Sequence, residues 1–238
     1  MTQTPNALPS DEAVFTVTPA WKAAYPTAHA GVLVIHGASN PPRHAELERR
    51  KTELESELRR RYAGLDRAGL MQNPTLKAYE EHYRRFKKTY HVQLQLESIL
   101  FRGKSIPAVA ALVEAMFMAE MDTLLLTAGH DLDTVRLPLT LDAASGSERY
   151  ILLRGEPQAP KAGDMVIRDQ EGIVSSIVYG PDQRTQINAR TQNAVFTAYA
   201  PEGIGVEAIR THLAEIQANV QLIAPDAQVG LLRIYAAA

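Results

Sequence analysis

The pattern of hydrophobic residues changes near Asp122, and this change limits the folds that the chain can adopt. Before it, apolar residues recur mainly at three- and four-residue steps, which is typical of helices. After it, six short apolar segments up to Pro201 are separated by turn residues, which is typical of strands. We therefore expect an α+β fold in which a mixed, largely antiparallel β-sheet packs against helices.

The first half of the chain contains the segments with helical spacing. We predict helices over residues 41–62, 74–90, 94–101 and 107–121. Asn40 and Asn73, each followed by proline, are the expected N-caps of the first two helices. Tyr79, Tyr83 and Phe86 recur at core spacing and should be buried, although such rings could also stack on bases. The helix that starts at Pro107 is almost entirely apolar and should lie at the centre of the core.

The remaining segments place strands near both ends of the chain. Apolar runs predict strands over residues 13–17 and 30–36, and a late helix and closing strand over 205–223 and 228–236. Because there is no internal repeat or long linker, one domain is more economical than two. We divide it into a helical part of about residues 12–106, a core of about 107–201 and a closing helix and strand over 202–238.

The composition excludes several kinds of chemistry. There is no cysteine, so no disulfide, thiol nucleophile or cysteine metal site can form, and a reducing compartment is the simplest setting. The seven histidines are scattered, and no zinc or dinucleotide motif occurs, so we expect neither a metal nor a cofactor. The first 13 residues lack the features of a secretory signal, and no apolar run reaches about 18 residues. We expect a cytoplasmic protein with no membrane partner.

One sequence motif suggests a catalytic loop but fails on context, and a second such motif is missing. Gly103-Lys104-Ser105 resembles the end of a phosphate-binding loop, but the first glycine that such a loop needs is replaced by Ser98. The segment also follows a helix instead of a strand, so the glycine is better explained as a helix end. No GxSxG segment is present to expose a serine nucleophile.

The charge is divided unequally along the chain. The 25 Lys and Arg and 27 Asp and Glu give a net charge of -2, which excludes a uniformly basic protein, and we expect no DNA partner. Residues 1–106 nevertheless have 16 basic and 11 acidic groups, whereas residues 107–238 have 9 and 16. The basic half could meet the phosphates of RNA, or its charges could form a solvated helix face. The strongest cluster comprises Arg84, Arg85, Lys87 and Lys88.

Two polar segments follow predicted strands. His130, Asp131 and Asp133 crowd the exit of one strand, where either a functional site or a turn stabilised by aspartate would fit. Ten polar residues between 182 and 193 separate two later strands. They could line a pocket for a polar ligand, with Arg184 or Arg190 suited to a carboxylate or phosphate, or they could form an exposed loop.

These segments, in this order, resemble a known family. The motifs are PAVAALVEAMFM, TAGHDLD, LTLDAASGSERYILLRG, DMVIRD, SSIVYG and TQNAVFTAYAP. From Pro107 to Pro201 their order and spacing resemble the B3/B4 domain of the phenylalanyl-tRNA synthetase beta subunit. The whole chain is similar to stand-alone B3/B4 proteins that lack the synthetase. The resemblance implies the architecture of that domain.

The resemblance also implies a function in translation quality control. In the synthetase this domain edits, because it hydrolyses the ester between tyrosine and the tRNA for phenylalanine. His130 matches the family's histidine, Ser175 and Ser176 match the Ala-Gly that lines the editing pocket, and Gly180 matches the last glycine of that segment. Thr197 stands where the family has the glutamate that recognises the tyrosine hydroxyl, so tyrosine specificity is not implied here.

Two functions from different classes follow. The first is a hydrolase of misacylated tRNA in which His130 orients the substrate or water and a polar pocket holds the aminoacyl group. The second is a module that binds RNA, a free amino acid or a synthetase-like partner without chemistry. The predicted pocket comprises Ser175, Ser176, Gly180, Arg184, Thr185, Thr191, Asn193 and Thr197.

Overall fold

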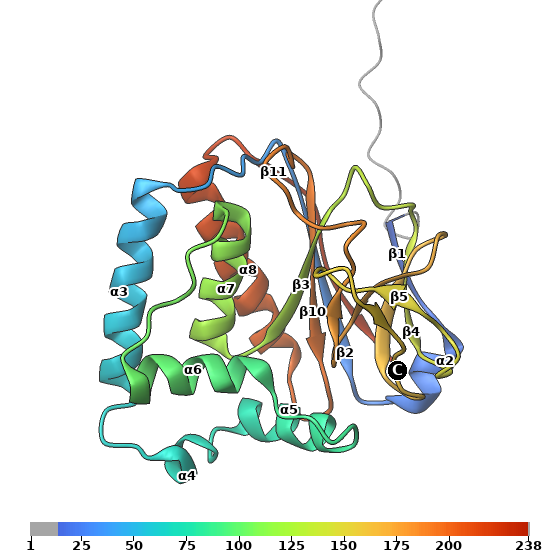
Figure 1. The fold of residues 1–238 in the computed structure, drawn as a ribbon, viewed down its shortest axis with the longest axis horizontal. Coiled ribbons are helices and arrows are strands. Elements are labelled where there is room, and N and C mark those ends of the chain that lie inside the picture. The colour runs from blue at the N-terminus through green and yellow to red at the C-terminus, as the bar shows by residue number, and fades with distance from the viewer. Residues whose placement is uncertain (1–13, 238) are drawn as a thin grey trace, which may run out of the picture.

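The computed structural model describes residues 14–237 as three layers: helices, a four-stranded sheet and a second sheet (Figure 1). The N-terminal segment 1–13, including the first residue of the predicted strand over 13–17, lies outside the described residues. The four-stranded sheet, in the order β11-β2-β10-β3, consists of β2 (His29–His36), β3 (Leu126–Asp131), β10 (Ala194–Ala200) and β11 (Gln228–Ala236). All its strand pairs are antiparallel.

The second sheet has the order β1-β4-β7-β8-β9. Its strands are β1 (Phe15–Val17), β4 (Leu139–Ala143), β7 (Met165–Arg168), β8 (Ile173–Ser176) and β9 (Gly180–Pro181), with a separate hairpin of β5 (Tyr150–Ile151) and β6 (Pro157–Gln158). Only the pair β1–β4 is parallel among the described strands. The predicted α+β class with a mixed, largely antiparallel sheet is therefore confirmed, although the strands divide into two main sheets.

Seven helices occur within the described residues. They are α2 (Pro19–Ala24), α3 (Ala45–Arg61), α4 (Arg67–Leu70), α5 (Pro74–Arg84), α6 (His91–Arg102), α7 (Ala111–Thr123) and α8 (Val206–Ile223). Residues 14–237 include no helix that is both long enough and apolar enough to cross a membrane. Gly103, in the left-handed conformation, ends α6. The P-loop-like glycine therefore acts as a helix end, as the sequence indicates.

Asn40 has a different partner from the one expected. The first long helix begins at Ala45, and Asn40 instead accepts the amide of Leu112 at 2.9 Å and donates to the Asn188 carbonyl at 2.9 Å. The amide of Leu112 belongs to the first turn of α7, where backbone donors lack helical partners. Asn40 therefore connects the start of α7 to the polar loop, and the prediction that it caps the helix over 41–62 is wrong.

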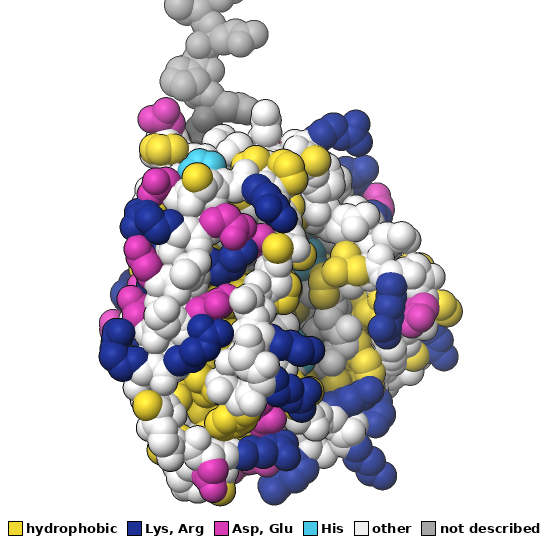
Figure 2. Space-filling model, turned by 60° about the vertical axis from the view of Figure 1, so that its left-hand side comes forward, with side chains coloured by type: hydrophobic (Ala, Val, Ile, Leu, Met, Phe, Trp, Pro, Cys, Tyr) yellow, Lys and Arg dark blue, Asp and Glu magenta, His cyan; other side chains and the backbone are white. Residues whose placement is uncertain are grey.

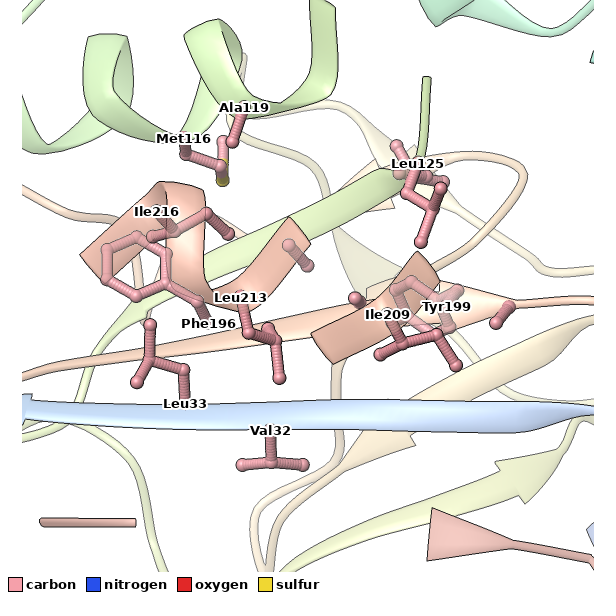
Figure 3. Packing of buried hydrophobic residues seen from close by; sticks show 14 of the residues in the cluster. Val32, Leu33, Met116, Ala119, Leu125, Phe196, Tyr199, Ile209, Leu213 and Ile216 are labelled. Atoms are coloured by element: carbon pink, nitrogen blue, oxygen red, sulfur yellow. The ribbon is translucent and has the colours of Figure 1, made fainter. Parts of the chain in front are cut away.

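Helices α7 and α8 cover one face of the four-stranded sheet (Figure 3). In this view Leu33 points toward α8, while Val32 on the same strand points to the opposite face. The helix comes very close to β2 at Gly31, where an added Cβ would lie 2.4 Å from Cγ2 of Ile209. Glycine is therefore required at this position by the approach of the helix.

The aromatic stripe of Tyr79 and Tyr83 in α5 and Phe86 just after it is buried, as its spacing predicts. Tyr79 and Tyr83 have at most 1% of their surface exposed, and Phe86 has 4%. The Tyr83 hydroxyl donates to the Ile177 carbonyl at 2.5 Å, and the Tyr79 hydroxyl donates to the carbonyl of Tyr199. These hydroxyls connect α5 to both sheets, which explains why tyrosine occupies these core positions.

The largest cluster of buried hydrophobic residues includes side chains from Val14 to Ala237. It draws on the helices and on strands of both main sheets. The organisation of the chain as a single domain stays a prediction.

Replacing Asn40 by alanine should destabilise the fold without altering its secondary structure. The change leaves the buried amide of Leu112 and the partly buried carbonyl of Asn188 without their partner, so we expect a loss of about 2 kcal/mol in the free energy of unfolding. Urea denaturation measures this loss. Gln192→Ala, at an exposed amide side chain, is the control and should change the free energy of unfolding by less than about 0.5 kcal/mol. An unchanged denaturation midpoint in Asn40→Ala would contradict the assigned role.

Candidate functional site

A cavity of about 310 Å³ lies at the free edge of β3. Its walls come from α6, α7, β3 and the turn between β8 and β9, and most of the lining is hydrophobic. Leu153 and Gln186 at its border are exposed, whereas Glu120, Ser176 and Tyr199 have at most 2% of their surface exposed. The buried groups define the inner end of the cavity, and the exposed ones define its mouth.

The molecular surface shows the same arrangement. On the face drawn in Figure 2, a hollow lined by hydrophobic side chains separates the helical part from the strands. Lys and Arg side chains gather below this hollow. An apolar cavity with a charged border is suited to a ligand that has an apolar body and a polar or anionic remainder.

The open edge of β3 supplies backbone donors to this region. The Thr127 amide donates to Glu120 Oε1 at 2.8 Å, and the Asp131 amide donates to the Thr185 carbonyl at 2.8 Å. Alternate residues of an antiparallel edge strand direct their amides to the same side. The amide of Gly129, midway between these two residues, therefore points to the edge where the cavity lies.

Two titratable residues of the cavity come from helices and were not predicted as site residues. Burial raises the pKa of Glu120 to about 8 and lowers the pKa of His91 to about 4. Since the Tyr83 hydroxyl donates to the Ile177 carbonyl, it accepts from His91 Nδ1, 3.2 Å away, and leaves Nε2 as a hydrogen-bond acceptor. The sequence signal for Glu120 is a carboxylate within a largely apolar helix, but helical spacing predicts only that this helix lies in the core.

His130 lies between the two sheets in a buried chain of hydrogen bonds. Its Nδ1 is 2.7 Å from Thr185 Oγ1, and its Nε2 is 3.2 Å from Ser175 Oγ. The Thr185 hydroxyl donates to Asp182, so it accepts from His130 Nδ1. His130 Nε2 then accepts from Ser175, whose oxygen accepts from the Tyr199 hydroxyl at 2.6 Å. Each donor in this chain has one acceptor, and the chain ends at a carboxylate.

This chain has the elements of a serine nucleophile but not its exposure. A serine hydroxyl bonded to an imidazole is the arrangement that activates serine for attack. Ser175 and His130, however, have no exposed surface. Tyr199 is the member of this hydrogen-bond chain that lines the cavity. The imidazole is therefore connected to the cavity wall through two hydrogen bonds, a geometry suited to positioning.

The other predicted pocket residues fall into separate places. Ser176 and Gly180 line the cavity, and Ser176 also donates to Asp164 at 2.5 Å. Thr197 is fully buried in β10, and its hydroxyl has no hydrogen-bond partner in the described part of the chain. Burial raises the pKa of Asp164 to about 7.

The polar loop is held mainly by carboxylates. Asp131 accepts the Thr191 hydroxyl at 2.6 Å and the amide of Asp133 at 3.1 Å, which is the aspartate-stabilised turn that the sequence offers as one interpretation. Asn193 donates to Asp133 at 2.9 Å and also contacts His36 at 3.1 Å. Thr191 and Asn193, both members of the predicted pocket, thus order the loop beside the site.

Arg184 is already paired with carboxylates. It contacts Asp169 at 2.8 Å, Glu171 at 3.3 Å and Asp182 at 3.7 Å. Hydrogen bonds from Arg184 and from backbone amides hold the pKa of Asp169 below its usual value despite burial. These partners satisfy the guanidinium without a ligand.

The four basic residues of the predicted RNA contact are all exposed but lie in two places. Arg84 and Arg85 line a separate cleft of about 400 Å³, and the Arg85 guanidinium lies 5.6 Å from the centre of the Tyr25 ring. The Lys88 ammonium lies 5.5 Å from the ring centre of Tyr179, in the turn beside the first cavity. Lys87 lies between these positions in the sequence.

Comparison with known proteins identifies the family. The model of the B3/4 domain matches residues 77–219, which is more than half of the chain. The protein belongs to the B3/4 domain family, as the motif order in its sequence indicates. No curated protein matches the chain.

A solved structure is also similar. It is an N-terminal fragment of the phenylalanyl-tRNA synthetase beta subunit from Pyrococcus horikoshii, with 12% sequence identity and a TM-score of 0.47. The match covers 96% of this chain and 52% of that one, so the protein spans about half the length of this relative.

Lowering the pH should destabilise the protein in part through His130. Burial, with the nearby Arg184 charge, lowers its pKa to about 4, while the unfolded value is about 6.5. The stabilisation by neutral His130 is therefore complete above pH 6.5 and is lost as the pH falls toward 4. Between pH 7 and 4.5 we expect a loss about 2 kcal/mol smaller in His130→Gln than in wild type.

Urea titrations at each pH measure this difference. The buried Glu120 and Asp164, whose raised pKa values act in the opposite direction, are common to both proteins and largely cancel. Parallel pH profiles for wild type and His130→Gln would contradict a neutral, buried imidazole.

Proposed function

We propose that this protein hydrolyses misacylated tRNA. Membership of the B3/4 domain family supports a function related to that of the synthetase domain. The observation that supports the proposal most is the position of the cavity. It is lined by α7, β3 and the turn from Ser176 to Gly180, three of the segments in which the sequence resembles the editing domain.

Hydrolysis would depend on placement of water and substrate. An aminoacyl ester is already activated, so a positioned water and donors aimed at the developing oxyanion can supply much of the rate. In our proposal the Gly129 amide faces the ester, and Tyr199 contacts substrate or water at the cavity wall. His130 acts as a positioning residue because it holds Tyr199 through Ser175. The absence of cysteine excludes a thiol nucleophile.

A binding module without chemistry is the second candidate function. Complete burial of His130 and Ser175 favours it, because neither side chain reaches the cavity surface directly. The ligand would then be RNA, a free amino acid or a synthetase-like partner. Cleavage of the aminoacyl ester distinguishes the hydrolase from the binding module.

Deacylation of a panel of mischarged tRNAs tests the proposed activity. Wild type should accelerate ester loss for at least one aminoacyl group, and His130→Ala should reduce this rate at least tenfold. Tyr199→Phe, which removes the hydroxyl bonded to Ser175, should reduce kcat to a similar extent. Tyr62→Phe removes the hydroxyl of a half-buried tyrosine that follows the last residue of α3, outside this hydrogen-bond chain, and should retain the wild-type rate.

The outcome separates the two candidate functions. Equal, enzyme-independent ester loss across the whole panel would contradict the hydrolase. Tight binding of tRNA or of an amino acid without accelerated ester loss would support the binding module.

We further propose that the tRNA backbone contacts the basic cluster at the C-terminal end of α5. Arg84, Arg85, Lys87 and Lys88 are exposed, and Lys88 lies beside the turn that borders the cavity. Phosphate contacts release counterions, so binding should weaken steeply as salt rises.

Charge reversal tests this contact. Arg84→Glu combined with Lys88→Glu should weaken tRNA binding at least tenfold and reduce its dependence on salt, because two phosphate contacts are lost. Arg136→Glu combined with Arg210→Glu changes the net charge equally at two arginines whose side chains are each 57% exposed. Electrophoretic mobility or fluorescence anisotropy measures both variants. The same affinity in both variants would assign the cluster to a solvated helix face.

A further inference from the structure

Two glutamates on the apolar helix α7 are almost completely buried. Glu114 and Glu120 each have 1% of their surface exposed. At Glu114, Oε1 accepts the Val109 amide at 2.8 Å and Oε2 accepts the Lys51 ammonium at 3.0 Å. One backbone amide and one ammonium group together satisfy this carboxylate.

Glu120 has the first of these partners but not the second. Its Oε1 accepts the Thr127 amide at 2.8 Å, the same length as the corresponding bond at Glu114. Within residues 14–237, no donor reaches its Oε2. Burying a charged group without a partner is costly, and burial correspondingly raises the pKa of Glu120 to about 8.

The cavity is the space in which the missing partner can lie. Glu120 lines it at the buried inner end, whereas the mouth is bordered by exposed residues. The described residues that line the cavity include no lysine or arginine that could compete for the carboxylate. Most of the lining is hydrophobic, so a ligand at this place needs an apolar body.

We propose that Glu120 binds a primary ammonium group of the ligand, in the way that Glu114 binds Lys51. The ligand is an amino-acid derivative, an identification that rests on the proposed function. Its ammonium is either the α-amino group or a side-chain amine. In both cases Glu120 takes a proton donor on Oε2 and retains the Thr127 amide on Oε1.

Isothermal titration calorimetry with three amino-acid amides tests this proposal on the full chain. Leucine amide has only an α-ammonium, Nα-acetyllysine amide has only a side-chain ammonium, and Nα-acetylleucine amide has neither. We expect at least one of the first two to bind at least tenfold more tightly than the third. The preferred probe identifies which ammonium Glu120 recognises.

Matched variants assign the preference to this carboxylate. Glu120→Gln keeps an oxygen for the Thr127 amide and should remove the preference for the ammonium probe. Glu207→Gln makes the same change at a side chain that is 85% exposed and should leave the preference intact. Should Glu120→Gln fail to fold, the affinities of the three amides for wild type still show whether an ammonium group is preferred.

Three outcomes would overturn the proposal. These are equal affinity for all three amides, no measurable binding of either ammonium probe, and an unchanged preference in Glu120→Gln. The titrations use no tRNA, so they are independent of the deacylation assay. Ammonium binding without deacylation would contradict only the proposed function, and deacylation without ammonium preference would contradict only this inference.

Discussion

Burial of β10 on both faces is the constraint on which the rest of the structure depends. All seven residues of this strand are buried, because helices cover one face of its sheet and the second sheet covers the other. Phe196 lies on the helical side, and Tyr199 contacts Ser175 of the second sheet. A strand buried in this way favours apolar residues, and a buried polar group without a partner is costly. The Thr197 hydroxyl, without a partner among the described residues, is such a group. The hydrogen-bond chain from Tyr199 to Asp182 supplies the partner of the Tyr199 hydroxyl.

The candidate site exists because the same sheet ends at β3. An edge strand has backbone groups without a strand partner, and natural proteins cover or occupy such edges. Here Glu120, Thr185 and the cavity occupy the edge of β3. The hydrogen-bond chain that contains His130 is buried, whereas the cavity at the edge of β3 is open. Tyr199 belongs to both, because it bonds to Ser175 and lines the cavity. Positioning and binding can thus be assigned to different residues.

Local sequence signals predicted much of the fold. Asn73 followed by proline begins α5, Gly103 ends α6, and the spacing of Tyr79 and Tyr83 matches a buried stripe. Each signal acts within one or two helical turns, so its outcome depends little on the remainder of the chain. Asn40 shows the limit of this reasoning, because its side chain bonds to residues 72 and 148 positions away. The B3/4 family was recognisable from motif order, since order is a property of the sequence.

The sequence by itself determined the class of fold, the family, the absence of thiol chemistry and a set of polar residues near the site. Only the tertiary structure decided which of these residues meet. It buried His130 and Ser175, paired Arg184 with carboxylates and placed Ser176 and Gly180 beside Glu120 in one cavity. The physical reason is that burial and hydrogen bonding are satisfied between segments distant in the chain. Periodicity reports only which residues face the interior, whereas pairing across layers determines which buried polar group remains open to a ligand.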